Sequence, residues 1–123
     1  MKQVLIVDDE ESTRLLLRRM LEAIPELEMT LADGRDTLEL IVEHSYDVIL
    51  LDLLMPGVGG IEVLARIRSS STNKTTPVII VSVMADAPTQ IVCRSLGISD
   101  YVVKPIKRKA VIDAVNAAIT AAK

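Results

Sequence analysis

Aromatic side chains are almost absent from this sequence, which has no Trp or Phe and only two Tyr. Proteins that bind single-stranded nucleic acids commonly stack bases on aromatic rings, so the composition disfavours this class. The formal net charge of −3 also disfavours a surface that follows a phosphate backbone. A short basic cluster is interpreted as the solvated first turn of a helix; it comprises Lys104, Lys107, Arg108 and Lys109. We therefore expect no nucleic-acid binding by this domain.

Cysteine and long hydrophobic runs are equally scarce. The one cysteine, Cys93, cannot form an internal disulfide, and its helical apolar surroundings indicate a structural thiol. No stretch approaches the ~18 apolar residues of a membrane span, and the apolar run at 4–7 is too short for a secretory signal. We expect a cytoplasmic protein with no membrane partner.

Short apolar runs recur along the chain at 4–7, 27–31, 48–51, 78–81 and 101–103. Runs of Val and Ile without polar alternation are typical of strands buried on both faces of a sheet. With 123 residues, half of them apolar, we expect one domain spanning residues 1–123 with a substantial core.

Segments with helical spacing separate these runs. Their apolar positions predict five helix faces: Leu17, Met20, Leu21 and Ile24; Leu38, Ile41 and Val42; Ile61, Leu64 and Ile67; Ile91, Val92 and Leu96; Val111, Ile112, Val115, Ala118 and Ile119. Pro25 is expected to end the first helix. Strands and helices in alternation predict an α/β fold with one doubly wound, five-stranded parallel sheet of order 2-1-3-4-5 and five helices, which is flavodoxin-like.

Functional side chains are expected just beyond the carboxyl ends of the strands, where ligands bind in such sheets. The residues found there are Asp8-Asp9-Glu10, Asp52, Ser82 and Lys104-Pro105. Clustered carboxylates repel one another, and Mg²⁺ resolves this because it prefers oxygen ligands and often bridges carboxylates to phosphate. An Asp can act as a nucleophile and become an aspartyl phosphate, with a lysine stabilising the transferred group. The set therefore predicts a Mg²⁺-dependent phosphoryl site.

Each of these residues also has an ordinary structural interpretation. The acids at 8–10 favour a helix start, and Asp52 could be a turn residue before Pro56-Gly57. Ser82 could be an ordinary strand-end hydroxyl, and a lone Lys104 would usually be solvated. The joint placement at four strand ends favours the functional interpretation.

At this point the sequence resembles the receiver domains of two-component response regulators. The resemblance covers essentially the whole chain and rests on VDDE at 7–10, LLDLLMPG at 50–57, IVS at 80–82 and DYVVKP at 100–105. It implies that Asp52 is the phosphoacceptor and that Lys104 bridges to the acyl phosphate. It also implies that Asp9 binds Mg²⁺ directly, that Asp8 binds it directly or through water, and that the Leu54 backbone carbonyl is a further ligand.

The same resemblance implies a switch. Ser82 is similar to the hydroxyl that moves toward the phosphoryl group, and Tyr101 to the aromatic residue whose rotamer follows it. The Lys104–Pro105 bond is expected to be cis. The sequence departs from the family pattern at Val83, where a small residue is usual, and Leu54 and Met84 are apolar at positions that influence dephosphorylation. All three are expected to modulate access to the site.

The resemblance implies a phosphoacceptor switch that catalyses its own phosphorylation and its slow dephosphorylation, rather than an enzyme with turnover. A histidine kinase or phosphotransfer protein would be the donor, and an output protein or domain would bind the face of the fourth helix, fifth strand and fifth helix. We expect a single-domain regulator or the N-terminal part of a longer protein. Two alternatives remain: a Mg²⁺-dependent aspartyl-phosphate phosphohydrolase and a receiver-like binding module that takes no phosphate.

Overall fold

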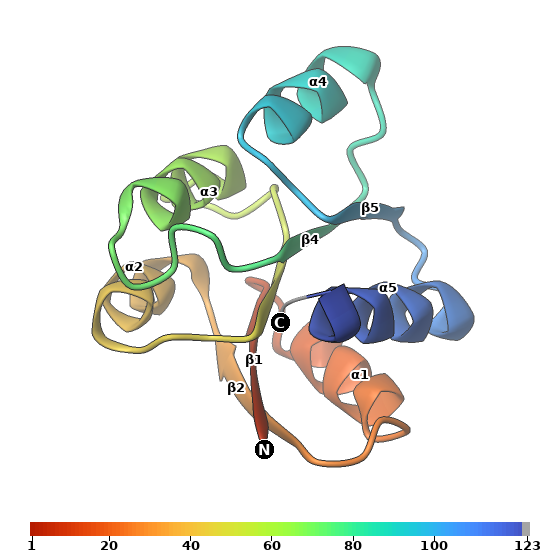
Figure 1. Cartoon of the computed structure of the whole chain (residues 1–123). Coiled ribbons are helices and arrows are strands. Elements are labelled where there is room, and N and C mark those ends of the chain that lie inside the picture. The colour runs from red at the N-terminus through yellow and green to blue at the C-terminus, as the bar shows by residue number, and fades with distance from the viewer. Residues whose placement is uncertain (122–123) are drawn as a thin grey trace.

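Five parallel strands form one sheet in the computed structural model, which describes residues 1–121 (Figure 1). The strands are β1 (Lys2–Val7), β2 (Leu27–Ala32), β3 (Val48–Leu51), β4 (Val78–Ser82) and β5 (Asp100–Val103). Their order across the sheet is β2-β1-β3-β4-β5, and every neighbouring pair is parallel. The predicted fold class and strand order are confirmed.

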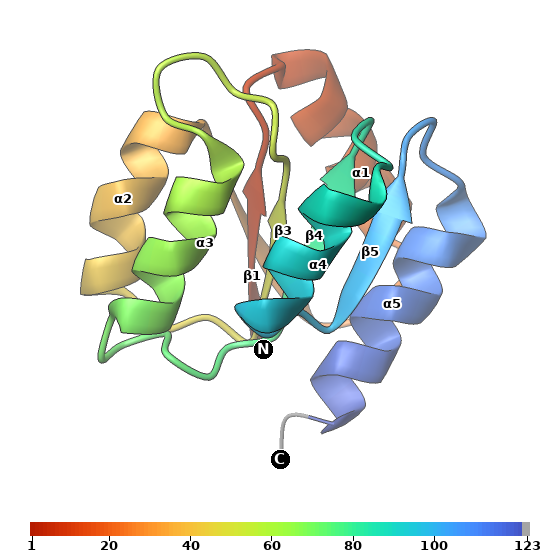
Figure 2. The ribbon, with the colours of Figure 1, turned by 90° about the horizontal axis from the view of Figure 1, so that it is seen from above.

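Helices cover both faces of the sheet (Figures 1 and 2). They are α1 (Glu11–Leu21), α2 (Gly34–Glu43), α3 (Gly60–Ser69), α4 (Ala87–Ser95) and α5 (Arg108–Ala121). Side chains of α1 and α5 share one buried cluster with the sheet, whereas α2, α3 and α4 share the other. None of the helices within residues 1–121 has the length and apolar character needed to cross a membrane.

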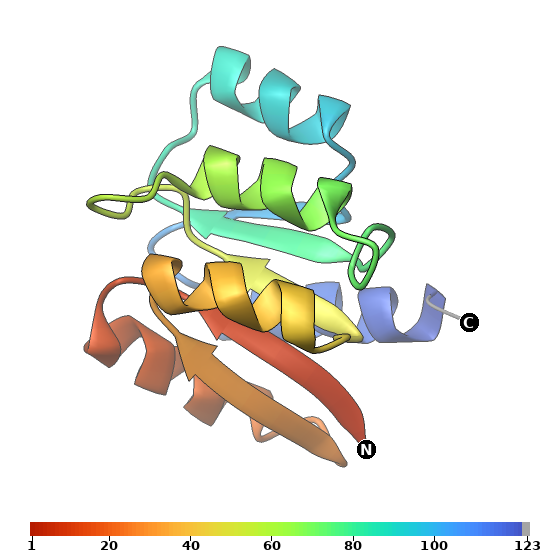
Figure 3. The same ribbon diagram turned by 90° about the vertical axis from the view of Figure 1, so that its left-hand side faces the viewer.

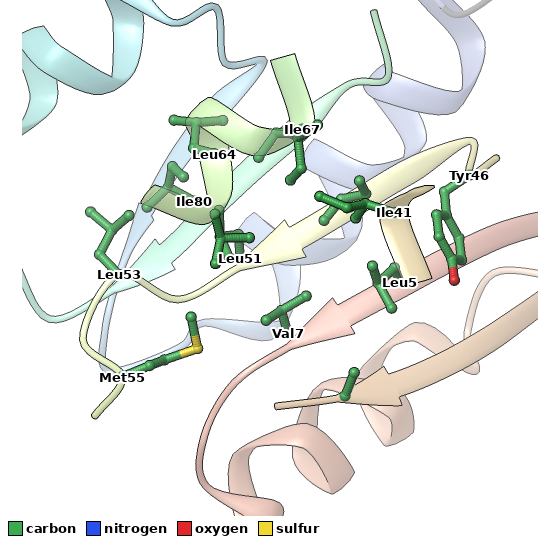
Figure 4. Close-up of a cluster of buried hydrophobic side chains, with 14 of the residues drawn as sticks. Leu5, Val7, Ile41, Tyr46, Leu51, Leu53, Met55, Leu64, Ile67 and Ile80 are labelled. Atoms are coloured by element: carbon green, nitrogen blue, oxygen red, sulfur yellow. The ribbon is translucent and has the colours of Figure 1, made fainter. Parts of the chain in front are cut away.

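The buried strands explain the absence of polar alternation in the sequence. In β1, Val4 and Ile6 pack toward α1 and α5, while Leu5 and Val7 pack toward α2 and α3. Successive side chains of a strand point to opposite faces, so a strand covered on both faces is apolar at every position. Figure 4 shows the cluster on the second face, where Leu51 and Ile80 of the sheet meet Leu64 and Ile67 of α3.

Two of the predicted helix faces are partly wrong. Ile91 and Val92 of α4 are 66% and 42% exposed, whereas Thr89 and Cys93 are buried. The buried side of α4 follows an i, i+4 spacing that includes a polar residue. The apolar residues alone therefore predicted the wrong face of α4 to be buried. Val42 of α2 is likewise 63% exposed. The prediction of a buried structural Cys93 is confirmed.

The start of α4 provides a prediction about local stability. The Asp86 carboxylate accepts hydrogen bonds from the Thr89 hydroxyl at 2.7 Å and from the Thr89 backbone N–H at 3.0 Å, which together lower the pKa of Asp86. Because the folded pKa is depressed, this stabilisation is present above the unfolded pKa of about 3.9 and is lost as pH falls through the folded value.

We therefore expect Asp86→Ala to increase amide hydrogen exchange at Thr89 near neutral pH, since the helix loses its cap. The difference from the unmodified protein should shrink as pH falls through the folded pKa of Asp86. Asp86→Asn, which keeps an acceptor for the backbone N–H, is the matched control and should exchange more slowly than the Ala variant. Equal exchange in both variants would show that the cap does not hold this turn.

Candidate functional site

Two buried carboxylates meet at the carboxyl edge of the sheet. Asp8 follows β1 and Asp52 follows β3, and the last residues of these adjacent strands, Val7 and Leu51, are paired in register. Asp8 is 1% exposed and Asp52 is 5% exposed. Adjacent parallel strands bring their next residues to the same place, so strand register positions the two acids together.

Lys104 forms an ion pair with each of the two acids. It follows β5, and its Nζ lies 2.9 Å from Asp8 Oδ2 and 3.3 Å from Asp52 Oδ2. The backbone N–H of Lys104 donates to the Ser82 carbonyl at 2.9 Å, and the Lys104–Pro105 peptide bond is cis. One ammonium group therefore serves two carboxylates at the strand ends.

The charges in this site do not balance. Burial raises the pKa of Asp52, and the nearby Asp8 charge raises it further, while Lys104 and the Leu54 N–H act in the opposite direction. Burial alone would lower the pKa of Lys104, but its hydrogen bond to Asp8 and the charges of both acids raise it. Two carboxylates against one ammonium leave excess negative charge at a largely buried site, where an additional cation would be stabilised.

Backbone groups hold the remaining oxygens of the acids. Asp8 Oδ1 accepts the Glu10 N–H at 2.9 Å, and Asp52 Oδ1 accepts the Leu54 N–H at 3.3 Å. The Arg14 Nη1 donates to the backbone carbonyl of Asp8 at 2.5 Å, which ties the first turn of α1 to this loop. In each carboxylate, one oxygen therefore accepts a hydrogen bond from a backbone N–H and the other accepts one from the Lys104 ammonium.

Ser82 and Tyr101 are linked through Met84. Ser82 is fully buried, and its Oγ accepts the Met84 N–H at 3.2 Å. The Tyr101 hydroxyl donates to the Met84 carbonyl at 2.5 Å. Hydrogen bonds to both backbone groups of one residue connect the end of β4 to the ring on β5, so a shift of this loop would alter the environment of Tyr101.

Other residues expected at the site are less enclosed. Asp9 is exposed, Leu54 and Val83 are 53% and 57% exposed, and the half-buried Met84 packs against the core. Within residues 1–121 no group of three His, Cys, Asp or Glu side chains is arranged to hold a metal ion. The structure thus brings Asp8, Asp52 and Lys104 together and leaves Asp9 at the rim.

The residues present nevertheless fit a hard divalent cation. Asp8 and Asp52 provide buried carboxylate oxygens in a site with excess negative charge, and the exposed Asp9 adjoins Asp8 in the chain. Mg²⁺ needs only one or two carboxylates, because it retains several waters and takes further oxygens from phosphate.

Two residues near the site were not predicted from the sequence. Arg14 resembles any other charged helix residue, and no spacing signal distinguishes it. Gly60 begins α3 against the loop after β3, and a Cβ built on it would lie 2.3 Å from the Asp52 carbonyl oxygen. The Gly59-Gly60 pair is a signal for such a close backbone approach, but only one of the two glycines needs it.

Solved receiver domains have the same fold as this chain. The Francisella response regulator 1452 receiver domain superposes with a TM-score of 0.88 at 32% identity, covering 100% of both chains. The receiver domain of the sensor histidine kinase PA1611 from Pseudomonas aeruginosa PAO1 has a TM-score of 0.85 at 25% identity, covering 97% of this chain and 98% of that one. The latter structure has a magnesium ion coordinated in its active site cleft.

Sequence comparison identifies the family. The transcriptional regulatory protein ResD of Bacillus subtilis is 39% identical over 119 residues, and the response regulator ArlR of Staphylococcus aureus is 35% identical over 105 residues. These alignments cover 94% and 85% of this chain but 47% of each relative, so the chain spans about half the length of these curated relatives. The response regulator receiver domain profile matches residues 4–116, and the chain therefore belongs to the receiver domain family of two-component response regulators.

Proposed function

We propose that residues 1–123 form one receiver that accepts a phosphoryl group on Asp52 from a histidine kinase or phosphotransfer protein. The observation that carries the proposal is a buried Asp52 that shares the Lys104 ammonium with a second buried acid, Asp8. An unpaired carboxylate at this position would be costly, so a site that keeps two acids and one lysine is suited to a ligand that brings further charges. We further propose that this switch acts in the cytoplasm.

Each residue has a distinct task in the proposed transfer. Asp52 forms the new P–O bond while the bond between phosphorus and the donor breaks, and hydrolysis later returns inorganic phosphate and the free carboxylate. Lys104 meets a phosphoryl oxygen and offsets the charge that develops there. Asp8, Asp9, Asp52 and the Leu54 carbonyl would hold Mg²⁺, which when bound neutralises phosphoryl oxygens.

The proposed output is a change in the face formed by α4, β5 and α5. If Ser82 turns its hydroxyl to a phosphoryl group on Asp52, it gives up the Met84 N–H, and the Met84 carbonyl holds Tyr101. Ile91, Val92 and Val103 lie exposed on this face and offer apolar surface to an output protein or domain. Two states with different contacts are required for such coupling.

The test is phosphorylation by a small phosphodonor with Mg²⁺, followed by intact mass. We expect a single lasting phosphoryl addition to the unmodified protein and none to Asp52→Asn, because the amide cannot act as the nucleophile. Release of phosphate without lasting modification would indicate the phosphohydrolase, and no change at all would indicate a binding module. Glu62→Gln, on the exposed surface of α3, is a control that should be phosphorylated normally.

The hydrolase alternative has less support at the residue level. Haloacid-dehalogenase-like phosphohydrolases carry a second Asp two residues after the nucleophile, as acid and base, and that position here is Leu54. Leu54 is 53% exposed and has no ionisable group, so it cannot activate a water. Slow self-hydrolysis is therefore part of the proposal, and turnover of an external substrate is not.

Val83 should influence the lifetime of the phosphorylated state. Its β-branched side chain follows Ser82 directly and is stiff at χ1, so it restricts approach to Asp52 if it lies over the site. We expect Val83→Ala to speed both phosphorylation by a small donor and loss of phosphate, by about threefold each, since both need in-line access. The measurement is phosphate decay after donor removal at constant Mg²⁺, and Val42→Ala, an exposed valine on α2, is the control. Unchanged rates of phosphorylation and phosphate loss would show that Val83 does not control access to Asp52.

A further inference from the structure

A cleft runs between α2 and β2, the edge strand at the opposite end of the sheet from β5. It consists of two adjoining hollows of about 310 and 470 Å³ that share Leu40. The first is bounded by Leu31 and the outward side chains of α2, and the second by Thr30 and the loop before β3. Figure 3 shows α2 on the side of the sheet where β1 and the edge strand β2 lie. We call this feature the α2–β2 cleft.

The α2–β2 cleft is strongly acidic. Its walls carry four carboxylates, Glu28, Asp36, Glu39 and Glu43, and contain no Lys or Arg. None of the four is in an ion pair in the described part of the chain, where all salt bridges involve other acids. Like charges gathered in one cleft repel one another, so this surface is suited to a cationic partner.

A buried tyrosine opens into the same cleft. Tyr46 is 8% exposed, yet within residues 1–121 its hydroxyl makes no hydrogen bond. No fully buried side-chain oxygen in this range lacks a partner, so the Tyr46 hydroxyl must reach the cleft that the ring lines. The ring lies at the edge of the core cluster in Figure 4. A buried tyrosine usually pairs its hydroxyl, as Tyr101 does, so Tyr46 offers an unused bond to a ligand.

The backbone of β2 is also unpaired on this side. β2 pairs only with β1 and so forms one edge of the sheet. The Lys2 N–H donates to the Glu26 carbonyl and the Asp8 N–H donates to the Ala32 carbonyl. The backbone N–H and C=O groups of the even-numbered residues of β2 therefore point toward β1. The peptide groups of Leu27, Met29 and Leu31 therefore point outward, as a template for another strand.

We propose that the α2–β2 cleft binds an extended basic segment of a partner protein, which adds to β2 as a further strand. Its backbone would pair with Leu27, Met29 and Leu31, and alternate Lys or Arg side chains would lie against the acids of α2. Tyr46 would accept one hydrogen bond from such a side chain. Addition of a strand at an exposed edge is an established mode of peptide recognition.

Charge decides between this occupant and others. A second copy of the chain would place the same acids against one another, and a nucleic acid would be repelled. The cleft lies on the α2 side at the β2 edge, away from the α4–β5–α5 face, so a bound segment would leave that face free. The proposal does not depend on phosphorylation of Asp52.

The experiment uses the full chain and a defined probe peptide, about eight residues of alternating Lys and Val, matched to an ordinary strand. Amide NMR spectra should shift along Leu27–Ala32, and hydrogen exchange should slow at Leu27, Met29 and Leu31 but not at Glu28 and Thr30. A peptide of alternating Glu and Val should cause neither change. Raising the salt concentration should weaken binding, since exposed charges are screened.

Two variants test the side chains. Glu39→Gln combined with Glu43→Gln should weaken binding about fivefold, and Tyr46→Phe about threefold. The control removes two charges far from the cleft, one on the opposite edge strand β5 and one on α5, by Asp100→Asn with Asp113→Asn, and should leave affinity unchanged. Equal losses in both double variants, shifts located away from β2, equal binding of the acidic peptide, or self-association through β2 would each overturn the proposal.

Discussion

Lys104→Met should destabilise the metal-free protein by about 2–3 kcal/mol at neutral pH, because it leaves two buried acids without their cation. The Lys104 ammonium lies 2.9 Å from Asp8 and 3.3 Å from Asp52, and both acid side chains are almost fully buried. Met is similar in length and apolar, so packing changes little while the charge disappears. Urea unfolding followed by circular dichroism measures the loss.

The pH dependence identifies the cause of this loss. Asp52 already has a raised pKa through burial and the Asp8 charge, and removing Lys104 removes an opposing influence. A carboxyl group with a raised folded pKa destabilises the fold progressively as pH rises from its unfolded pKa to its folded pKa, so the variant should regain stability as pH falls from the folded value toward the unfolded one. Mg²⁺ should also restore part of the loss, because it binds the native state.

Two further variants complete this test. Lys104→Met with Asp52→Asn should be more stable than Lys104→Met alone, since one of the unpaired charges has gone. Lys109→Met breaks an exposed ion pair with Asp113, whose side chains are 88% and 61% exposed, and should change stability little. If Lys104→Met and Lys109→Met unfold at the same urea concentration, the buried acids do not need Lys104.

The fold could be predicted because buried parallel strands have a distinctive sequence. β1, β3 and β4 each contain a continuous run of four Val, Ile and Leu residues that few other structures produce, and turn residues mark the segments between them. The buried face of α4 could not be predicted, because the polar Thr89 is buried and the apolar Ile91 is exposed. A polar side chain that bonds to its own helix cap is buried at low cost, and composition does not reveal this.

The acids of the site were predictable for a geometric reason. Parallel strands all end at one edge, so Asp8, Asp52 and Lys104 could be brought together from their positions after strands. Arg14 and the hydroxyl of Tyr46 could not, because their importance depends on which partners the tertiary structure supplies or withholds. Asn73 is similar: it is 1% exposed and donates to the Ile41 and His44 carbonyls, contacts between segments far apart in the sequence.

Gly60→Ala should destabilise the protein by about 3 kcal/mol and slow the proposed phosphorylation of Asp52. An added Cβ would lie 2.3 Å from the Asp52 carbonyl oxygen and 2.4 Å from the Leu53 Cα. Both neighbours are backbone atoms, so relief requires α3 or the loop after β3 to move rather than a side chain to rotate. The Gly60 N–H also donates to the Leu53 carbonyl at 3.0 Å, and a shift would weaken this bond. Urea unfolding and the rate of phosphorylation by a small donor measure the two effects.

Gly59→Ala is the matched control for this prediction. It adds the same methyl group one residue earlier, where nothing lies within 4 Å of the new Cβ and φ is −70°. Gly59 occupies the N-cap of α3 and makes no side-chain capping bond, so replacing it by Ala should cost about 1 kcal/mol or less, well below the cost at Gly60. The comparison therefore separates close packing against Asp52 from any general effect of glycine on the unfolded chain. Equal stability and equal phosphorylation rates in the two variants would mean that α3 can withdraw from the loop freely, and that Gly60 does not position Asp52.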